Sequence, residues 1–259
     1  MRAHGFLVRM MVIGHSGKVM IGHIIKGALI RFWAFLRRDS SPKVVFYHDV
    51  GKRYTPMGTD LNVFLHHMAC LRKEDVVCFD DGFRGLWDNR EQLAVSRQRL
   101  DTRVIVFLAV ELVGKQGYLT WDEIRELQDK YGIEFQCHTW SHQTLVGPYN
   151  KEVQEPENGR TAEWYQHELV GSKAELERQL GKKVTALCFP VGYFSDDVIR
   201  LCKTAGYEKV YASYPGNATD DYVQPRCLAQ DLSVGAFNSV LRGGMSVLTS
   251  RYLKLHKFS

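Results

Sequence analysis

Apolar residues recur along this chain with two different periods, and the two periods alternate from residue 44 onward. Seven short apolar runs, several rich in β-branched and aromatic residues, are typical of buried strands: Val44–Tyr47, Val76–Phe79, Arg103–Leu108, Ile133–Cys137, Val184–Phe189, Lys209–Ala212 and Val223–Cys227. Apolar residues spaced three or four apart predict helices between them, at 61–72, 86–99, 161–181 and 195–205. Strands that alternate with helices predict a parallel sheet.

Polar residues mark the starts of two helices. Thr120 is followed three residues later by Glu123, the spacing of a capping box, in which each side chain bonds the other residue's backbone N–H. Thr161 precedes the long helical pattern that ends near Gly181. Residues 147–160 are rich in glycine, proline, asparagine and charge, and we expect a mobile loop there.

The strand at 76–79 runs directly into two carboxylates and a glycine, Asp80, Asp81 and Gly82. Side chains alternate between faces within a strand, but this alternation loosens at the strand end, so both carboxylates can enter one pocket in different roles. Two like charges this close are unfavourable unless a cation lies beside them. A divalent metal ion is the simplest such cation, and Gly82 leaves room for a sharp turn and a ligand.

A pair of histidines follows the strand at 133–137. His138 and His142 are four residues apart, so they share one face if the segment turns helically. That spacing suits two imidazole ligands on one metal ion. With Asp81 they form a His-His-carboxylate set that leaves coordination positions open, as catalytic sites do. Asp80 is then free to act as a base.

Length and composition agree with one globular barrel. The chain has 259 residues, 45% apolar and 24% charged, which accommodates one α/β barrel with a full core. Its six cysteines include no Cys-x-x-Cys pair, so we expect buried reduced thiols in a reducing compartment and no zinc–cysteine site. We identify no secretory signal and no run of about 18 uncharged apolar residues that would predict a spanning helix.

The net charge of +5 is placed unevenly along the chain. Residues 1–43 hold eight Lys or Arg and one acid, a net charge of +7, while the remainder carries −2. A helix predicted at 17–38 has an apolar stripe along one side. Two interpretations stay open: the stripe packs on the barrel of a cytoplasmic protein, or it lies on an anionic membrane at its inner face. The arm has few aromatic residues for stacking, so we expect no nucleic-acid partner.

The two motifs resemble those of a known family. Phe79-Asp80-Asp81-Gly82 followed by His138-Thr139-Trp140-Ser141-His142 is similar to the first two motifs of the polysaccharide deacetylases, the NodB-homology group or carbohydrate esterase family 4. The similarity continues through residues 118–124, and residues 189–193 resemble the third motif. It extends from residue 44 to about 228. We therefore divide the chain into a basic amphipathic arm at 1–43 and a catalytic barrel domain at 44–259.

The resemblance implies a fold, a cofactor and several residue roles. The fold is a distorted (β/α) barrel with about seven parallel strands, whose reactive residues lie at strand ends. The cofactor is one divalent metal ion, zinc before cobalt, nickel or manganese, held by Asp81, His138 and His142. Asp80 is the base that takes a proton from metal-activated water, and the Val191 N–H is a donor to the developing oxyanion.

Two family residues are not at their usual positions. Most members take the general acid from a Leu-x-x-His strand near the C-terminus, and here only His256 has that context, without a strand pattern. His48 instead ends the first barrel strand. Because a barrel is closed, its last strand can move to the front of the sequence without moving in space, as in the similar poly-N-acetylglucosamine deacetylases. We therefore assign His48 as acid. Cys188 replaces an arginine that orients the base in many members, and Arg226 is our candidate substitute.

The expected activity is removal of an N-acetyl group from an amino sugar, in a saccharide or a lipid-linked saccharide. One alternative is another amidase or a deformylase acting on a lipid-linked sugar. The other is a degenerate member that binds a saccharide without catalysis. On the catalytic interpretation, Asp80→Asn should keep the fold and lose activity.

Overall fold

The structure is a computed structural model that describes residues 41–146, 160–214, 221–230, 232–243 and 257–258. Its elements are β1 (Val44–Tyr47), β2 (Asp49–Val50), β3 (Gly58–Thr59), α2 (Leu61–Cys70), β4 (Val76–Asp80), α3 (Gly85–Asp88), α4 (Arg90–Leu100), β5 (Arg103–Leu108), η2 (Val110–Leu112), α5 (Trp121–Tyr131), β6 (Glu134–Cys137), α6 (Ala162–Tyr165), η4 (Gln166–Gly171), α7 (Ser172–Leu180), β7 (Ala186–Cys188), η5 (Pro190–Gly192), β8 (Phe194–Ser195), α8 (Asp196–Thr204), β9 (Lys209–Ala212), β10 (Val223–Pro225), β11 (Cys227–Leu228), α9 (Val234–Leu241) and β12 (Lys257–Phe258).

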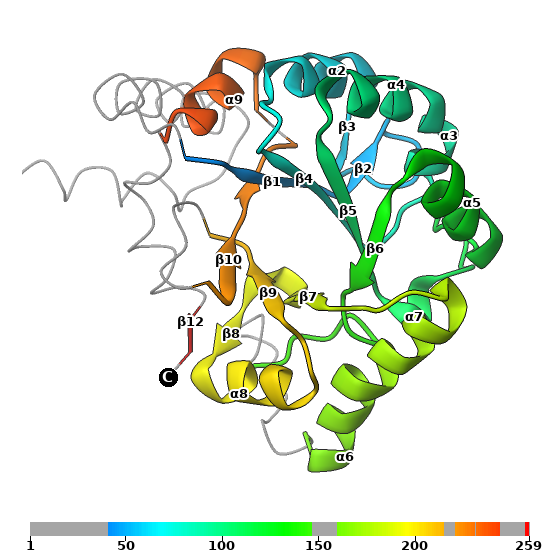
Figure 1. The fold of residues 1–259 in the computed structure, drawn as a ribbon, viewed down its shortest axis with the longest axis vertical. Coiled ribbons are helices and arrows are strands. Elements are labelled where there is room, and N and C mark those ends of the chain that lie inside the picture. Colours follow the sequence, from blue (N-terminus) through cyan, green and yellow to red (C-terminus); the bar gives the residue numbers. More distant parts are fainter. Residues whose placement is uncertain (1–40, 147–159, 215–220, 231, 244–256, 259) are drawn as a thin grey trace, which may run out of the picture.

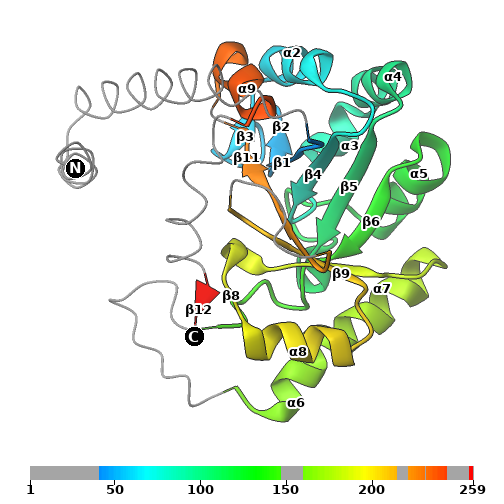
Figure 2. The same cartoon turned by 60° about the vertical axis from the view of Figure 1, so that its left-hand side comes forward.

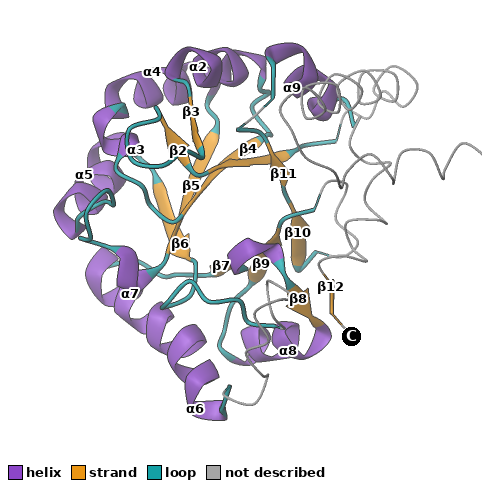
Figure 3. Cartoon of the chain, turned by 180° about the vertical axis from the view of Figure 1, so that it is seen from behind, coloured by secondary structure: helices purple, strands orange, loops and turns teal. Residues whose placement is uncertain are grey.

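Eight strands form one parallel sheet in the order β10-β9-β7-β6-β5-β4-β1-β11. The two edge strands, β10 and β11, are pieces of one extended segment at 223–228, divided only by Arg226. β10 pairs with β9 and β11 pairs with β1, so this closing segment joins the two edges. The result is a barrel with seven strand positions, the last one split, which confirms the expected fold. Figures 1 and 3 show the ring of strands with helices around it.

Alternate strand residues fill two separate cores. Outward-facing side chains such as Val45, Phe79 and Val106 pack beneath the helices in the larger core. The inward-facing set fills the barrel itself: Phe46, Cys78, Ile105, Phe107, Ala186, Cys188 and Tyr211. Each fully buried large apolar side chain contributes about 1.5–3 kcal/mol. Figure 2 shows β4, β5 and β6 side by side and pointing the same way, as their parallel pairing requires.

The helices form close to their expected bounds, with two differences. The capping box is present: Thr120 Oγ1 accepts from the Glu123 N–H at 3.3 Å, and Glu123 Oε2 accepts from the Thr120 N–H at 2.9 Å. The helix predicted at 86–99 is broken at Asn89 into α3 and α4. The helix predicted at 161–181 runs from Ala162 to Leu180 but includes the π-helical segment η4, which the apolar periodicity did not indicate.

Some elements were not predicted, and some predictions fall outside the described residues. The short parallel pairs β2–β3 and β8–β12 and the helix α9 carried no clear pattern. The arm helix at 17–38, the loop at 147–159 and His256 lie outside the described ranges, so the domain boundary and both interpretations of the arm stay predictions. All six cysteines lie within the described ranges and are free thiols. Among the described helices, none has the length and apolar character needed to cross a bilayer.

A buried carboxyl lies next to His48 in the chain. Asp49 is fully buried, and its Oδ1 accepts from the Val50 N–H at 2.9 Å. Its Oδ2 has no hydrogen-bond partner among the described residues. Burial raises the pKa of Asp49 to about 7 from an ordinary 3.8, against the opposing effect of the Val50 hydrogen bond. The folded protein therefore disfavours the ionised carboxylate.

Asp49→Asn should stabilise the protein at high pH. A carboxyl whose pKa is raised on folding lowers stability as pH rises from about 4 to about 7, and the loss is complete above that range. A shift of about three units corresponds to about 4 kcal/mol. Urea unfolding should show the variant more stable than the parent at pH 8 and nearly equal at pH 4.5. Asp221→Asn, which changes an exposed carboxyl, is the control; a gain at pH 8 in both variants would contradict the explanation.

Candidate metal centre and active site

The sheet register brings the sequence motifs to one end of the barrel. Tyr47 pairs with Phe79 between β1 and β4, so His48 and Asp80 follow at adjacent strand ends. Leu108 pairs with Cys137 between β5 and β6, and His138 comes next. Carboxyl ends of parallel strands meet at the same end of a barrel. Four neighbouring strands and the turn after β7 therefore surround one site.

Three candidate metal ligands lie together at this site. One donor atom from each of Asp81, His138 and His142 lies within 4.8 Å of the others. Asp81 Oδ1 is 3.0 Å from His142 Nε2 and 3.6 Å from His138 Nε2. Asp81 is only 6% exposed, and Oδ1 makes no hydrogen bond of acceptable geometry in the described part of the chain. A buried carboxylate oxygen that faces two ring nitrogens fits a divalent cation among the three.

The surroundings of His138 and His142 prepare them differently for a metal ion. His138 Nδ1 lies 2.8 Å from the Cys188 carbonyl, so Nδ1 carries the hydrogen and Nε2 offers its lone pair. Burial lowers the pKa of His138 to about 4, which keeps the ring neutral as a ligand must be. For His142 burial also acts to lower the pKa, but the adjacent Asp81 carboxylate outweighs it and raises the pKa above the ordinary value.

A second possible ligand set is less suitable. Asp80, His138 and Cys188 also place donor atoms within 4.8 Å of one another. However, burial raises the pKa of the Cys188 thiol well above its usual range, so the thiolate that a metal needs is disfavoured. Both Asp80 oxygens accept from an arginine instead. The Asp81 set is therefore the better metal site.

Backbone strain is concentrated at the site. Five described non-glycine residues have positive φ, and four of them surround it: Asp81 (68°), Thr139 (68°), His142 (62°) and Val191 (60°). Left-handed backbone costs an ordinary residue about 1–2 kcal/mol, and such strain clusters at functional sites. The same angles correct one prediction. His138 and His142 meet, with ring centroids 4.8 Å apart, through left-handed turns and not through a helical turn.

Arg226 contacts the candidate base directly. Its Nη1 donates to Asp80 Oδ1 at 2.6 Å and its Nη2 to Asp80 Oδ2 at 2.9 Å. Both residues are buried, and the guanidinium lies over the Phe46 ring at 4.3 Å inside the barrel. Burial alone would raise the pKa of Asp80, but the Arg226 charge dominates with help from His138, and the pKa falls below its usual range. Asp80 is thus ionised and held in one orientation.

His48 has a neutral partner that the sequence pattern did not indicate. Its Nδ1 lies 2.7 Å from Gln230 Oε1. The Gln230 backbone is fixed in turn, because its carbonyl accepts from Thr59 Oγ1 at 3.2 Å. The preceding residue, Ala229, donates its N–H to Phe46 O at 3.0 Å. Gln230 follows the last strand by two residues, and no spacing in the sequence connects it with His48.

The remaining candidates are placed as follows. Val191 lies in the turn η5 directly after β7, with φ 60° and an exposed side chain. Of the aromatic residues near the motifs, Phe194 is buried and stacks on Phe189, so it belongs to the core. Trp140 packs against His167, with centroids 4.3 Å apart.

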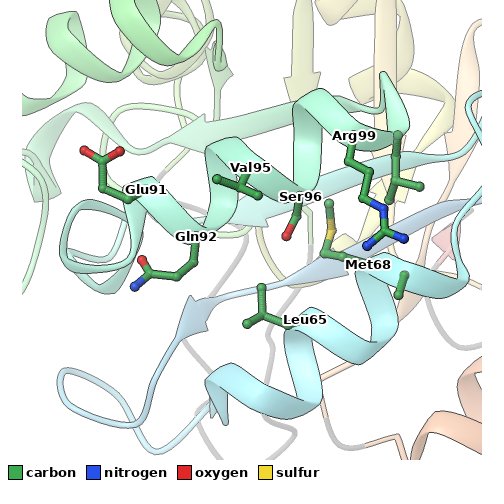
Figure 4. A pocket seen from close by; sticks show the side chains of 9 residues that line it. Leu65, Met68, Glu91, Gln92, Val95, Ser96 and Arg99 are labelled. Carbon is green, nitrogen blue, oxygen red and sulfur yellow. The ribbon is translucent and has the colours of Figure 1, made fainter.

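A groove on the outer surface is separate from this site. It lies between α2 and α4, with a volume of about 460 Å³, and its lining includes Leu65, Met68, Val95 and Arg99 (Figure 4). No candidate catalytic or metal residue lines it. We therefore do not assign it to substrate.

Comparison with known proteins agrees with the fold and with the family resemblance. A family model for polysaccharide deacetylase matches residues 71–210, more than half of the chain. YxkH of Bacillus subtilis (strain 168), a protein assigned to the polysaccharide deacetylases, is 23% identical over 146 residues, 56% of this chain and 47% of its own length. The chain thus spans about half the length of that relative.

Solved structures show the same architecture. BC0361, a polysaccharide deacetylase from Bacillus cereus, superposes with a TM-score of 0.62 at 23% identity, covering 77% of this chain and 68% of the other. IcaB from Ammonifex degensii gives a TM-score of 0.61 at 16% identity, covering 79% and 98%. Identities this low establish likeness of fold alone, whereas the family match extends over most of the barrel. This chain belongs to the polysaccharide deacetylase family.

Proposed function

We propose that this protein is a metal-dependent hydrolase that removes the N-acetyl group from an amino sugar, in a saccharide or a lipid-linked saccharide. The observation that carries the proposal is the grouping of the Asp81–His138–His142 set with the Asp80–Arg226 pair at one barrel end. Hydrolysis of an amide needs an activated water, a base and an acid, and this site offers groups for each. Family membership supports the substrate class.

The metal ligands and the base have separate tasks. Asp81, His138 and His142 would hold one divalent ion, zinc first, which when bound lowers the pKa of water and polarises an acyl oxygen. Asp80 would accept the proton of the attacking water at a carboxylate oxygen. A carboxylate has lone pairs beyond those that Arg226 occupies, so the paired oxygens can still receive a proton. Arg226 fixes which lone pairs face the site.

The acid and the oxyanion donor complete the arrangement. If Gln230 Oε1 accepts from His48 Nδ1–H, Nε2 is the nitrogen that delivers a proton to the departing amine. The Val191 N–H would donate to the acyl oxygen as charge develops there. Its strained backbone is consistent with a donor that is fixed before substrate arrives.

His48→Ala should lower deacetylation by about 10²–10⁴-fold, the range for a lost general acid. Acetate release would be measured on N-acetylated mono-, oligo- and lipid-linked saccharides. The loss should be much smaller with an aryl acetate ester, because its leaving group departs without a proton. His66→Ala changes an exposed histidine on α2 and is the control.

The same assay separates the alternatives. If the parent protein binds a saccharide but releases acetate from none of those tested, the alternative of a degenerate binding member is supported. Release of another acyl group in place of acetate would support the amidase or deformylase alternative. If His256→Ala is inactive while His48→Ala is not, the permuted assignment of the acid is wrong.

A further inference from the structure

A buried carboxylate outside the motifs holds the loop between the two histidines. Glu168 is 1% exposed. Its Oε2 accepts from the backbone N–H groups of Trp140 at 2.9 Å and Ser141 at 3.0 Å, and its Oε1 accepts from Ser141 Oγ at 2.7 Å. All three donors lie between His138 and His142 in the chain. Hydrogen bonds to a charged group are about twice as strong as neutral ones, so Glu168 is a strong side-chain anchor of this loop.

The π-helical segment η4 explains how Glu168 reaches the loop. A π segment inserts one residue into a helix and rotates the residues after it about the helix axis, and here it buries Glu168 and Leu169 while Gln166 and His167 stay exposed. One carbonyl group of this segment bonds a side chain from outside the helix. Leu169 O accepts from Tyr207 Oη at 2.8 Å.

The same helix also contacts the strand before the loop. Ser172 Oγ, one turn beyond Glu168, donates to the Glu168 carbonyl and lies 3.2 Å from Cys137 Sγ, at the end of β6. The helix therefore contacts the chain on both sides of His138: Ser172 contacts Cys137 before it, and Glu168 bonds residues 140–141 after it. The π segment thus sets the direction of the Glu168 side chain, because a regular helix would place position 168 at a different angle about the helix axis.

The loop needs an external anchor because its own backbone is strained. Thr139 and His142 both have positive φ, at 68° and 62°. Inside the loop, the His142 N–H donates to Thr139 Oγ1 at 3.2 Å, a single neutral hydrogen bond of about 1 kcal/mol. That is comparable with the cost of one left-handed residue. Two backbone hydrogen bonds from η2 also hold the loop, from the Val110 N–H to Thr139 O at 3.3 Å and from the Glu111 N–H to Trp140 O at 2.9 Å. Among the side chains, Glu168 adds three contacts to a carboxylate.

We infer that Glu168 is a positioning residue that sets the metal affinity of the site by holding His138 and His142 in their binding geometry before the ion arrives. The inference rests on the proposed function only in taking these histidines as ligands. Groups that orient metal ligands typically change metal affinity by about 10–100-fold when removed. Glu168 does so from outside the motifs, through the loop backbone.

The test measures zinc binding to the full chain by competition with a chromophoric chelator. Glu168→Ala should bind zinc about 10–100-fold more weakly than the parent. Glu168→Asp keeps the charge but is one methylene too short to reach the loop, so it should weaken binding similarly. Glu168→Gln keeps the length, can accept from both N–H groups and can donate to Ser141, so it should recover most of the affinity. Glu175→Ala, on α7, removes an ion pair with Arg178 and a hydrogen bond from Gln179, neither of which touches the loop, and should bind as the parent does.

The pattern among variants decides between positioning and mere stability. Urea unfolding of the metal-free proteins provides the second readout: a purely structural Glu168 would lower stability without changing zinc affinity. Parent-like zinc affinity in Glu168→Ala or, if that variant does not fold, in Glu168→Asp would overturn the inference while leaving the proposed function intact. If the parent itself binds no divalent ion, the metal centre and this inference both fail.

Discussion

Asp80→Asn should abolish deacetylation and also destabilise the fold. The catalytic loss should reach at least the 10²–10⁴-fold that a general base contributes. The stability loss follows from Arg226, which is 1% exposed and whose two contacts with Asp80 are its ion pair. Removing one partner of a buried ion pair costs about 3–5 kcal/mol, because the other charge stays buried without compensation. The sequence alone led us to expect an intact fold, and the contacts revise that expectation.

A double variant separates the two effects. Asp80→Asn combined with Arg226→Met removes the buried charge along with its partner and replaces it with an apolar chain of similar length. Urea unfolding should show most of the lost stability restored, while acetate release stays absent. Arg226→Met alone should be destabilised, because it leaves the Asp80 carboxylate buried without its cation. If Asp80→Asn alone is as stable as the parent, then some other group compensates the buried Arg226 charge and this explanation is wrong.

His138→Ala and His142→Ala should each lose the bound metal ion and with it hydrolysis. Three protein donors are the usual number for a catalytic ion of this kind, and two are too few for retention through purification. Metal content per chain, measured by elemental analysis, is the readout, and removal of the ion from the parent by a chelator should abolish activity reversibly. His66→Ala should retain the metal. Full activity in metal-free protein would refute the metal-dependent reaction.

The sequence predicted the parts of the fold and site that depend on local pattern. Arg103–Leu108 and Lys209–Ala212 were predicted at their observed bounds because each is a short apolar run with clear limits. The motif residues of the proposed site were found because each follows such a strand, and parallel strands bring their carboxyl ends together. His48 could be proposed because ring closure makes the strand order cyclic.

The features that escaped prediction depend on tertiary contacts. The period of 3.6 residues extends through 161–181, so the inserted residue at η4 and the inward turn of Glu168 leave no mark in the apolar pattern. Gln230 lies near the last strand without a distinctive neighbour. The spacing of His138 and His142 correctly predicted that the two rings lie together, but the helical turn proposed to bring them together was wrong. Left-handed backbone at Thr139 could not be foreseen from a threonine.

The closing segment at 223–228 also constrains the order in which the molecule can fold. Its pairing with β1 joins residues from opposite ends of the barrel domain, and contacts of such long sequence separation form late, because the entropy of a large loop is lost before they contribute. Arg226 lies in this segment, and Gln230 follows it. In a chain whose ring is still open, Asp80 would thus lack the Arg226 guanidinium and His48 would lack the Gln230 amide. On the proposed mechanism, closure of the ring by this segment is therefore a condition for activity.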